Sequence, residues 1–200
     1  LIIELSFTNL DLILINASVF NKYSAVLITK LVKLWLPKYF LLLSNNSNPS
    51  EISKYLCKFE KYLSIPIING LSPNSHPTQI LSDIFTVEEI KNKPISSLNI
   101  AWIGDSNNVL NSLIAASIKF SFKLSIGCPT KYQPSKKIMK YIKSNNNKIR
   151  ILHDPKKAVK GADVIFSDKV ISMNDKVNKS KKLNQFKKFK INKKLMSFAK

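Results

Sequence analysis

The sequence predicts an α/β protein with two parallel sheets, and three observations lead to that prediction. Short apolar runs alternate with segments of helical apolar spacing along most of the 200 residues, and such alternation favours parallel sheets with right-handed crossovers. The alternation is interrupted over Lys91–Ser97, which contains Pro94 and is typical of a linker. With 44% hydrophobic and 22% charged residues, the chain has enough apolar side chains for a buried core.

The first half carries three short apolar runs, each expected to be a strand, and three segments of helical spacing. Pro37 ends the first of these helices, and the Ser/Asn-rich stretch 44–50 is expected to be a loop. We therefore expect a first domain over residues 1–96. The runs cover residues 9–16, 39–43 and 65–69, and the helical segments cover 24–36, 51–63 and 77–90.

The second half repeats the alternation and predicts a second domain over residues 97–200. Strands are expected over 98–103, 123–126, 148–152 and 163–166, and helices over 108–120, 135–143 and 155–159. From Asn174 onward Lys and Asn dominate, which allows either a solvated basic tail or a packed helix. The apolar series that favours packing is Leu183, Phe186, Phe189, Ile191, Leu195 and Phe198.

The formal charge of +20, from 32 Lys and Arg against 12 Asp and Glu, favours anionic partners such as phosphate compounds, nucleic acid or acidic lipid surfaces. The charge does not choose among them. A bias toward Lys, Ile and Asn is also what AT-rich coding sequence produces without selection for a ligand. Arg150 is the one arginine of the sequence and lies in a predicted strand.

Cys57 and Cys128 belong to no Cys/His cluster, so neither a disulfide framework nor a metal site is expected, and a reducing cytoplasm fits best. The apolar stretch Ala25–Leu43 is interrupted by lysines such as Lys30 and Lys33. Each lysine at mid-membrane costs about 2.5 to 3.5 kcal/mol. A membrane span is therefore not expected, and no secretory signal is evident.

The common nucleotide and acyl-transfer motifs do not occur in the sequence. Gly104 is followed by Asp105 and Ser106 rather than by the further glycines of a dinucleotide loop. Neither a phosphate-binding G-x-x-x-x-G-K-[ST] loop nor a hydrolase G-x-S-x-G elbow is present. No cofactor is expected.

Polar residues follow four of the predicted strands, where α/β sheets bind their ligands. Among them, the His76 imidazole can donate to a substrate carbonyl, and Gln79 offers both a donor and an acceptor. A lone His before a helix is more often a cap or a surface residue. The four places are His76–Gln79, Asp105–Asn108, His153–Asp154 and Asp168–Met173.

Three of these strings, in this order, resemble the ornithine carbamoyltransferases of the aspartate/ornithine carbamoyltransferase superfamily. His76-Pro77-Thr78-Gln79, within a longer match over 69–86, resembles the family's carbamoyl-phosphate segment. Gly104–Asn108 resembles its Gly-Asp-x-Asn-Asn loop, and Asp168 with Ser172-Met173 resembles its Asp-x-x-x-Ser-Met loop. The resemblance implies two α/β domains of the transcarbamoylase type and a homotrimer.

The resemblance also implies residue roles. His76 and Gln79 would bind carbamoyl phosphate, with His76 as the catalytic residue that polarises the carbonyl. No metal and no organic cofactor is implied. The ornithine-binding residues would be Asn108, which holds the amino-acid head, together with Asp168, Ser172 and Met173.

The sequence departs from the family pattern in several places. Leu1–Glu4 contains no arginine where the family has its Ser-Thr-Arg-Thr-Arg phosphate loop, and polar residues near Ser44 replace another family arginine. Leu183–Ala199 resembles the helix and strand that precede the family's His-Cys-Leu-Pro loop. Both domains are therefore expected to be incomplete. Asn174 stands where the family has glycine after Ser-Met, and Lys169–Ile171 lacks the usual tryptophan.

The expected function is transfer of a carbamoyl group from carbamoyl phosphate to the δ-amino group of L-ornithine, which gives citrulline and phosphate. Arginine biosynthesis or the urea cycle, in the cytoplasm, is the setting that the resemblance implies. A first alternative is an inactive remnant that retains amino-acid binding or oligomer contacts. A second alternative is nucleic-acid binding through the basic stretch after Asn174, which is not favoured because no known nucleic-acid-binding motif accompanies its lysines. The sequence does not separate ornithine from acylated ornithines.

Overall fold

A computed structural model describes residues 12–16, 39–43, 67–145, 148–171 and 178–200. Two compact units divide the chain, Leu1–Gln79 and Ile80–Lys200. Each unit has its own parallel sheet, as the alternation in the sequence predicts.

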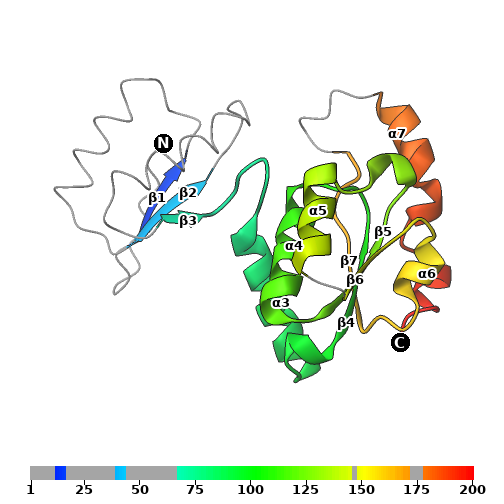
Figure 1. Ribbon diagram of the computed structural model, residues 1–200, viewed down its shortest axis with the longest axis horizontal. Coiled ribbons are helices and arrows are strands. Elements are labelled where there is room, and N and C mark those ends of the chain that lie inside the picture. The colour runs from blue at the N-terminus through cyan, green and yellow to red at the C-terminus, as the bar shows by residue number, and fades with distance from the viewer. Residues whose placement is uncertain (1–11, 17–38, 44–66, 146–147, 172–177) are drawn as a thin grey trace. The chain divides into compact units, whose positions relative to one another are not determined.

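The sheet of the first unit contains β1 (Leu12–Asn16), β2 (Tyr39–Leu43) and β3 (Ile67–Asn69), in that order and all parallel (Figure 1). Its register places Leu12 opposite Tyr39 and Phe40 opposite Ile67. The three predicted strands are therefore confirmed. The predicted helices over 24–36 and 51–63, with Pro37 and the loop 44–50, lie outside the described residues.

Helix α3 (Pro77–Lys91) confirms the helix predicted to follow His76. Its proline occupies the first turn, where no intrahelical hydrogen bond is lost. Ile80 and Ile84, 2% and 5% exposed, belong to the core of the second unit. The segment after α3, predicted as a linker, is anchored rather than loose, because Ile95 is buried at the start of the 3-10 turn η2 (Ile95–Ser97). The predicted domain boundary at residue 96 stays a prediction.

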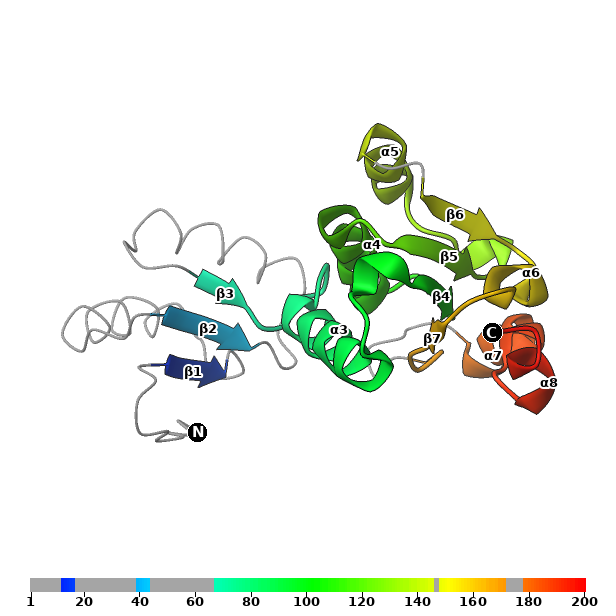
Figure 2. The ribbon, with the colours of Figure 1, turned by 90° about the horizontal axis from the view of Figure 1, so that it is seen from below.

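The sheet of the second unit consists of four parallel strands in the order β6-β5-β4-β7 (Figure 2). The chain moves outward from β4 through β5 to β6 and then returns to the other side of β4 to form β7. The direction of winding therefore reverses between β4 and β7. The strands, β4 (Asn99–Ile103), β5 (Lys123–Gly127), β6 (Ile149–Leu152) and β7 (Val164–Phe166), match the predicted ones closely.

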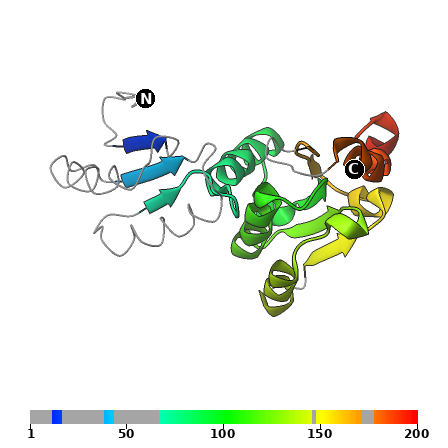
Figure 3. The same cartoon turned by 90° about the horizontal axis from the view of Figure 1, so that it is seen from above.

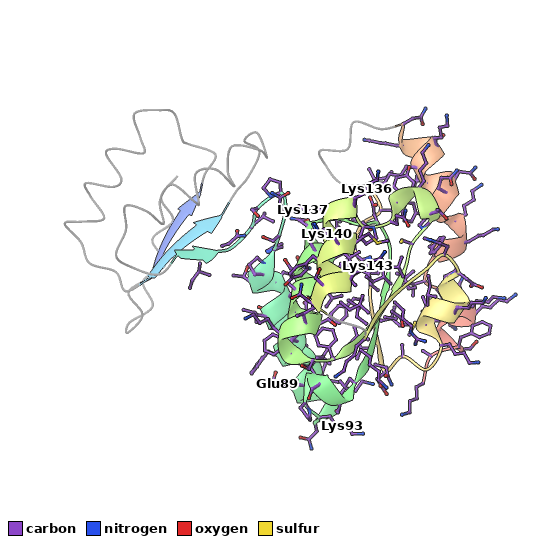
Figure 4. The ribbon with its side chains drawn as sticks, viewed as in Figure 1. Glu89, Lys93, Lys136, Lys137, Lys140 and Lys143 are labelled. Atoms are coloured by element: carbon purple, nitrogen blue, oxygen red, sulfur yellow. The ribbon has the colours of Figure 1, made fainter. Side chains whose placement is uncertain are left out.

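Side chains of the central strands alternate between the two faces of the sheet, as the pleat requires. Ile100 and Trp102 of β4 belong to one apolar cluster, whereas Ala101 and Ile103 belong to another. The first cluster lies under α3, α4 (Asn108–Phe120) and α5 (Lys136–Asn145), which cover that face (Figure 2). On α5, Ile142 is buried, and the exposed lysines labelled in Figure 4 are Lys136, Lys137, Lys140 and Lys143.

The second face is covered by short helices, with 3-10 turns between them. Figure 3 shows the C-terminal segment beside α6 (Pro155–Val159), and Gly127 of β5 lies beneath α6. A Cβ on Gly127 would come within 2.6 Å of Ile103 Cδ1 and 2.8 Å of Ala158 Cβ, so only glycine allows this close packing. The other elements on or near this face are η3 (Thr130–Tyr132), α7 (Lys179–Phe186), η4 (Lys187–Phe189) and α8 (Lys193–Met196).

The C-terminal residues pack onto the sheet and are not a solvated tail over 178–200. Phe186, Phe189 and Leu195 are buried, while Leu183 and Phe198 remain exposed. The strand expected within Leu183–Ala199 is wrong, because the residues after α7 form η4 and α8 and no strand lies in 178–200. The end of the chain is tied down by the Lys200 N–H, which donates to the Ala162 carbonyl at 2.9 Å.

Within the described residues, no helix has both the length and the apolar character needed to cross a membrane.

Candidate functional site at the carboxyl edge of the second sheet

The loops that leave β4 and β7 start from the same edge of the sheet. The two strands are parallel neighbours, with Trp102 opposite Phe166, so the residues that follow them are brought together. This edge is also where the winding of the sheet reverses, the position at which open α/β sheets bind ligands. The polar residues that follow β4 and β7 are therefore the candidate site.

Asn107 connects the two loops. Its side-chain oxygen accepts a hydrogen bond from the Leu110 N–H at 3.0 Å and so caps α4. Its amide nitrogen donates to Asp168 Oδ2 at 2.7 Å. A side-chain amide has both an acceptor oxygen and a donor nitrogen, so Asn107 can serve the helix and the carboxylate at once. The start of α4 thereby fixes the position of Asp168.

Asp168 retains capacity for a ligand. Its Oδ1 accepts from the Lys169 N–H at 2.7 Å, and its Oδ2 accepts from Asn107. A carboxylate has about four lone-pair sites, so two acceptor positions are left. The side chain is only partly buried, and no lysine or arginine of the described part of the chain forms an ion pair with it. A ligand with N–H donors, such as an amine or an ammonium group, suits this carboxylate.

Asp105, in the same loop, is neutralised within the protein. Lys182 of α7 lies 2.5 Å from Asp105 Oδ2 and is only 4% exposed. The ammonium also lies 5.5 Å from the centre of the Tyr132 ring, which adds a cation–π contact. The backbone of the loop is held as well, because the Trp102 indole N–H donates to the Asp105 carbonyl at 3.2 Å. Asp105 is therefore a structural carboxylate, in contrast to Asp168.

The residues that follow β5 and β6 do not form a nucleophile pair. Cys128 is fully buried, and burial, with a smaller contribution from Asp105, raises the pKa of its thiol to about 11. The thiol is therefore protonated at neutral pH and is a poor nucleophile. His153 Nδ1 lies 3.0 Å from the Cys128 carbonyl oxygen. This predicted position thus contacts the backbone, and Asp154 next to it caps α6 by accepting from Lys156 N–H.

His76 and Gln79 belong to the first unit. Thr78 Oγ1 donates to the Gly70 carbonyl at 2.7 Å and lies 3.4 Å from His76 Nδ1, so Thr78 links both residues of the loop before α3. Gln79 lies in the first turn of α3 and is partly buried. In the same loop, the amide of Asn69 donates to Ser75 Oγ at 2.8 Å.

The structure tests the position of some predicted site residues but not their roles. Asn108 is the first residue of α4 and is partly buried, whereas the side chain that meets Asp168 is that of Asn107. Ser172 and Met173 lie outside the described residues. The described residues contain no group of three His, Cys, Asp or Glu side chains that could hold a metal ion.

Sequence reasoning missed two features of the site. Asn107 immediately precedes the predicted helix 108–120, and Asn is a preferred residue at that position, so its capping role had a signal. The buried ion pair of Asp105 and Lys182 had no signal in the sequence. Lysine is almost never fully buried without a partner, and the partner of Lys182 is distant in the sequence.

A doubly wound α/β unit with an amide and a carboxylate at the switch point is a type of protein that binds small polar ligands. Comparison with known proteins identifies the family within this class. Residues 96–200 match the family model described as the Asp/Orn binding domain of aspartate/ornithine carbamoyltransferase. The chain belongs to the aspartate/ornithine carbamoyltransferase family.

Similar proteins and structures agree with this assignment. An ornithine carbamoyltransferase from Methanosarcina acetivorans is 39% identical over 143 residues, which are 72% of this chain and 47% of the relative. One from Aquifex aeolicus is 37% identical over 150 residues, 73% of this chain and 48% of the relative. The chain thus spans about half the length of the curated relatives it matches.

Two solved structures have the same fold. The anabolic ornithine carbamoyltransferase of Campylobacter jejuni matches with a TM-score of 0.73 and 32% identity, over 89% of this chain and 56% of the other. The enzyme from Pyrococcus furiosus matches with a TM-score of 0.72 and 31% identity, over 89% and 54%. The predicted resemblance and the predicted parallel α/β fold are confirmed.

Proposed function

We propose that this protein is an ornithine carbamoyltransferase, which transfers the carbamoyl group of carbamoyl phosphate to the δ-amino group of L-ornithine. The proposal includes a place in arginine biosynthesis or the urea cycle and a cytoplasmic homotrimer as the working form. Family membership supports the type of reaction. The single structural observation that carries the proposal is the partly exposed carboxylate of Asp168, positioned by Asn107 at the switch point.

In this proposal the second unit binds ornithine. Asp168 and Ser172 position the deprotonated δ-amine for attack, Asn108 holds the amino-acid head and Met173 packs against the ligand. Holding the amine in one orientation makes the reaction effectively unimolecular, which lowers the entropic part of the barrier. The hydrogen bond from Asn107 to Asp168 supports such a role, because it orients the carboxylate before the ligand arrives.

The first unit supplies the groups that bind carbamoyl phosphate, His76 and Gln79. The ornithine nitrogen forms a bond to the carbonyl carbon, the bond from that carbon to the phosphate oxygen breaks, and phosphate leaves with its electron pair. The nitrogen loses a proton as citrulline forms. His76 stabilises the negative charge that develops on the carbonyl oxygen.

An assay of citrulline formation tests the proposal, with both substrates near saturation and a control without protein. Asp168→Asn keeps the shape of the side chain but removes its charge, so we expect citrulline formation to fall on the order of a hundredfold. Asp154→Asn is the matched control, because Asp154 also follows a strand of this sheet but caps α6. A wild-type rate no higher than the control without protein would refute the catalytic proposal.

One observation favours a second candidate, an inactive remnant that still binds the amino acid. Arg150 is the one arginine of the sequence, and the structure places it on β6, away from the carboxyl edge. Polar residues near Ser44 replace one family arginine. A guanidinium contact to a phosphate contributes about 1.5 to 3 kcal/mol, so its loss weakens phosphate binding at least about tenfold. Calorimetry with each substrate alone distinguishes the two candidates. A remnant binds ornithine but not carbamoyl phosphate, whereas the enzyme binds both.

A further inference from the structure

The amino edge of the second sheet collects basic residues on the face that α6 covers. The register places Asn99 opposite Lys123 and Ser125 opposite Arg150. Lys148 comes directly before β6, and its carbonyl accepts from the Leu124 N–H at 3.2 Å, so it continues the same register. Because side chains alternate along a strand, Lys123 of β5, Arg150 of β6 and Lys148 just before β6 lie on one face of two neighbouring strands.

These residues line a small recess. A fourth cation, Lys160, is the C-cap of α6, and the remaining lining residues are two neutral polar and three apolar ones. Cationic and polar groups thus line a depression that is reached from one edge of the sheet. The lining includes Lys123, Lys148, Arg150, Lys160, Asn99 and Ser125.

Three of the cations, Lys123, Arg150 and Lys160, have no carboxylate partner among the described residues. Asp163, the acid bonded to Asn99, accepts from the Asn99 N–H at 2.9 Å and lies 3.7 Å from the Lys200 ammonium. Like charges on facing positions of neighbouring strands are destabilising, and an anion between them would remove that cost.

The shape and charge of the recess define the ligand class. A guanidinium fork binds two oxygens of one phosphate group, and lysines around it act as point charges. The recess is small, so it suits a phosphate group rather than a long polymer. The α5 lysines differ, because they lie along the outer surface of one helix without an arginine among them (Figure 4). They are typical of a solvated helix face.

We propose that the recess formed by Lys123, Lys148, Arg150 and Lys160 is a binding site for a small phosphorylated anion. It lies at the edge of the sheet opposite to Asp168, and the inference rests on the fold alone rather than on the proposed reaction. Free phosphates and nucleotides share the chemistry that this site recognises.

Isothermal titration calorimetry on the full chain tests the site, with pyrophosphate as the probe and sodium chloride at matched ionic strength as the reference. The double variant Lys123→Gln/Arg150→Gln removes two of the cations, and we expect its dissociation constant for pyrophosphate to rise at least about tenfold. Lys136→Gln/Lys140→Gln on α5 makes the same change in net charge and is the matched control. It should bind pyrophosphate as the wild type does.

Two further measurements complete the experiment. Far-ultraviolet circular dichroism tests whether the double variant is folded. If the double variant is unfolded, the single variant Lys160→Gln takes its place, because this exposed change should also weaken pyrophosphate binding. ATP titrated beside pyrophosphate distinguishes the sources, since tighter binding of ATP assigns a nucleotide and equal or weaker binding assigns a free phosphate. The proposal fails if wild-type protein releases no more heat with pyrophosphate than with chloride, or if the α5 control loses as much affinity as the double variant.

Discussion

The two edges of the second sheet carry charge in opposite ways. At the carboxyl edge, Asp105 is matched by the buried Lys182, and Asp168 is held by Asn107. At the amino edge, Lys123 and Arg150 line the same recess, and no described residue of its lining is a carboxylate. The comparison teaches that the number of charges at an edge says less about binding than whether the chain itself pairs them.

Breaking the buried pair at the carboxyl edge is expected to have the largest effect. Asp105→Ala leaves the Lys182 ammonium, 4% exposed, without its carboxylate. Removal of one partner from a buried ion pair costs about 3 to 5 kcal/mol of the free energy of unfolding. Urea denaturation of the wild-type and variant proteins measures this loss.

The amino edge offers the control for that experiment. Lys200→Ala removes the partner of Asp163, but Lys200 is 73% exposed, and exposed pairs contribute only about 0 to 1 kcal/mol. Equal losses in the free energy of unfolding for the two variants would contradict the larger contribution expected from the buried pair.

The next largest effects on stability are expected from alanine substitutions of the glycines near the two edges. Gly127→Ala at the carboxyl end of β5 brings a methyl group against Ile103 and Ala158, and such overpacking costs about 1 to 3 kcal/mol. Gly161→Ala meets nothing within 4 Å, but its φ of +69° strains an alanine backbone, at about 1 to 2 kcal/mol. Thermal unfolding of the two variants measures which substitution is more destabilising. Crystal structures of the variants should show α6 displaced only for Gly127→Ala, and an undisplaced α6 in that variant would contradict the packing argument.

Asn107 allows its two roles at the carboxyl edge to be separated. Asn107→Ala removes both the cap of α4 and the donor to Asp168, and loss of a cap costs about 0.5 to 2 kcal/mol. Asn107→Ser retains a capping oxygen but has no amide to reach Asp168. In chemical denaturation the serine variant should recover most of the lost stability. In calorimetry it should bind ornithine as weakly as the alanine variant, and full recovery of binding would show that the contact with Asp168 is dispensable.

The smallest effect concerns Asp163 at the amino edge and depends on pH. The Asn99 N–H, followed by the nearby Lys200 charge, holds the pKa of this carboxyl below its ordinary value of 3.8. A lowered folded pKa contributes stability that is complete above the unfolded value and is lost as the pH falls through the folded value. Asp163→Asn should therefore cost about 0.5 to 1 kcal/mol at neutral pH. In acid titrations followed by circular dichroism, the difference from wild type should begin to shrink below about pH 3.8 and disappear once the pH has fallen through the lower folded pKa, and a gap that widened there would contradict the sign.

Much of the second unit could be predicted from local signals. The bounds of α4 and α6 were predictable because Asn107 and Asp154 are capping residues and Pro155 is suited to a first turn. The strand that the family resemblance implied near the C-terminus is not present in 178–200, whereas the apolar series there correctly allowed a packed helix. The choice of two short helical segments depends on packing of Phe186 and Leu195 against the sheet, which no local pattern encodes.

The site was predictable to the level of loops but not of side chains. The strand pattern brings the Asp168 loop beside the loop after β4, yet two adjacent asparagines fit the start of α4. A shift of one residue decides whether Asn107 or Asn108 points to the carboxylate, and helix boundaries are uncertain by more than that from sequence. The Lys182 contact depends on a partner far away in the chain, so tertiary structure was needed to find it.

The hydrogen bond between Trp102 and the Asp105 carbonyl gives the protein an intrinsic fluorophore at the candidate site. The indole is 1% exposed, and its N–H is bonded to the loop that carries Asn107. The sequence contains one other tryptophan, Trp35, so a Trp35→Phe variant would emit from Trp102 alone. Its emission would then report, without any added dye, each event that moves the backbone at this edge.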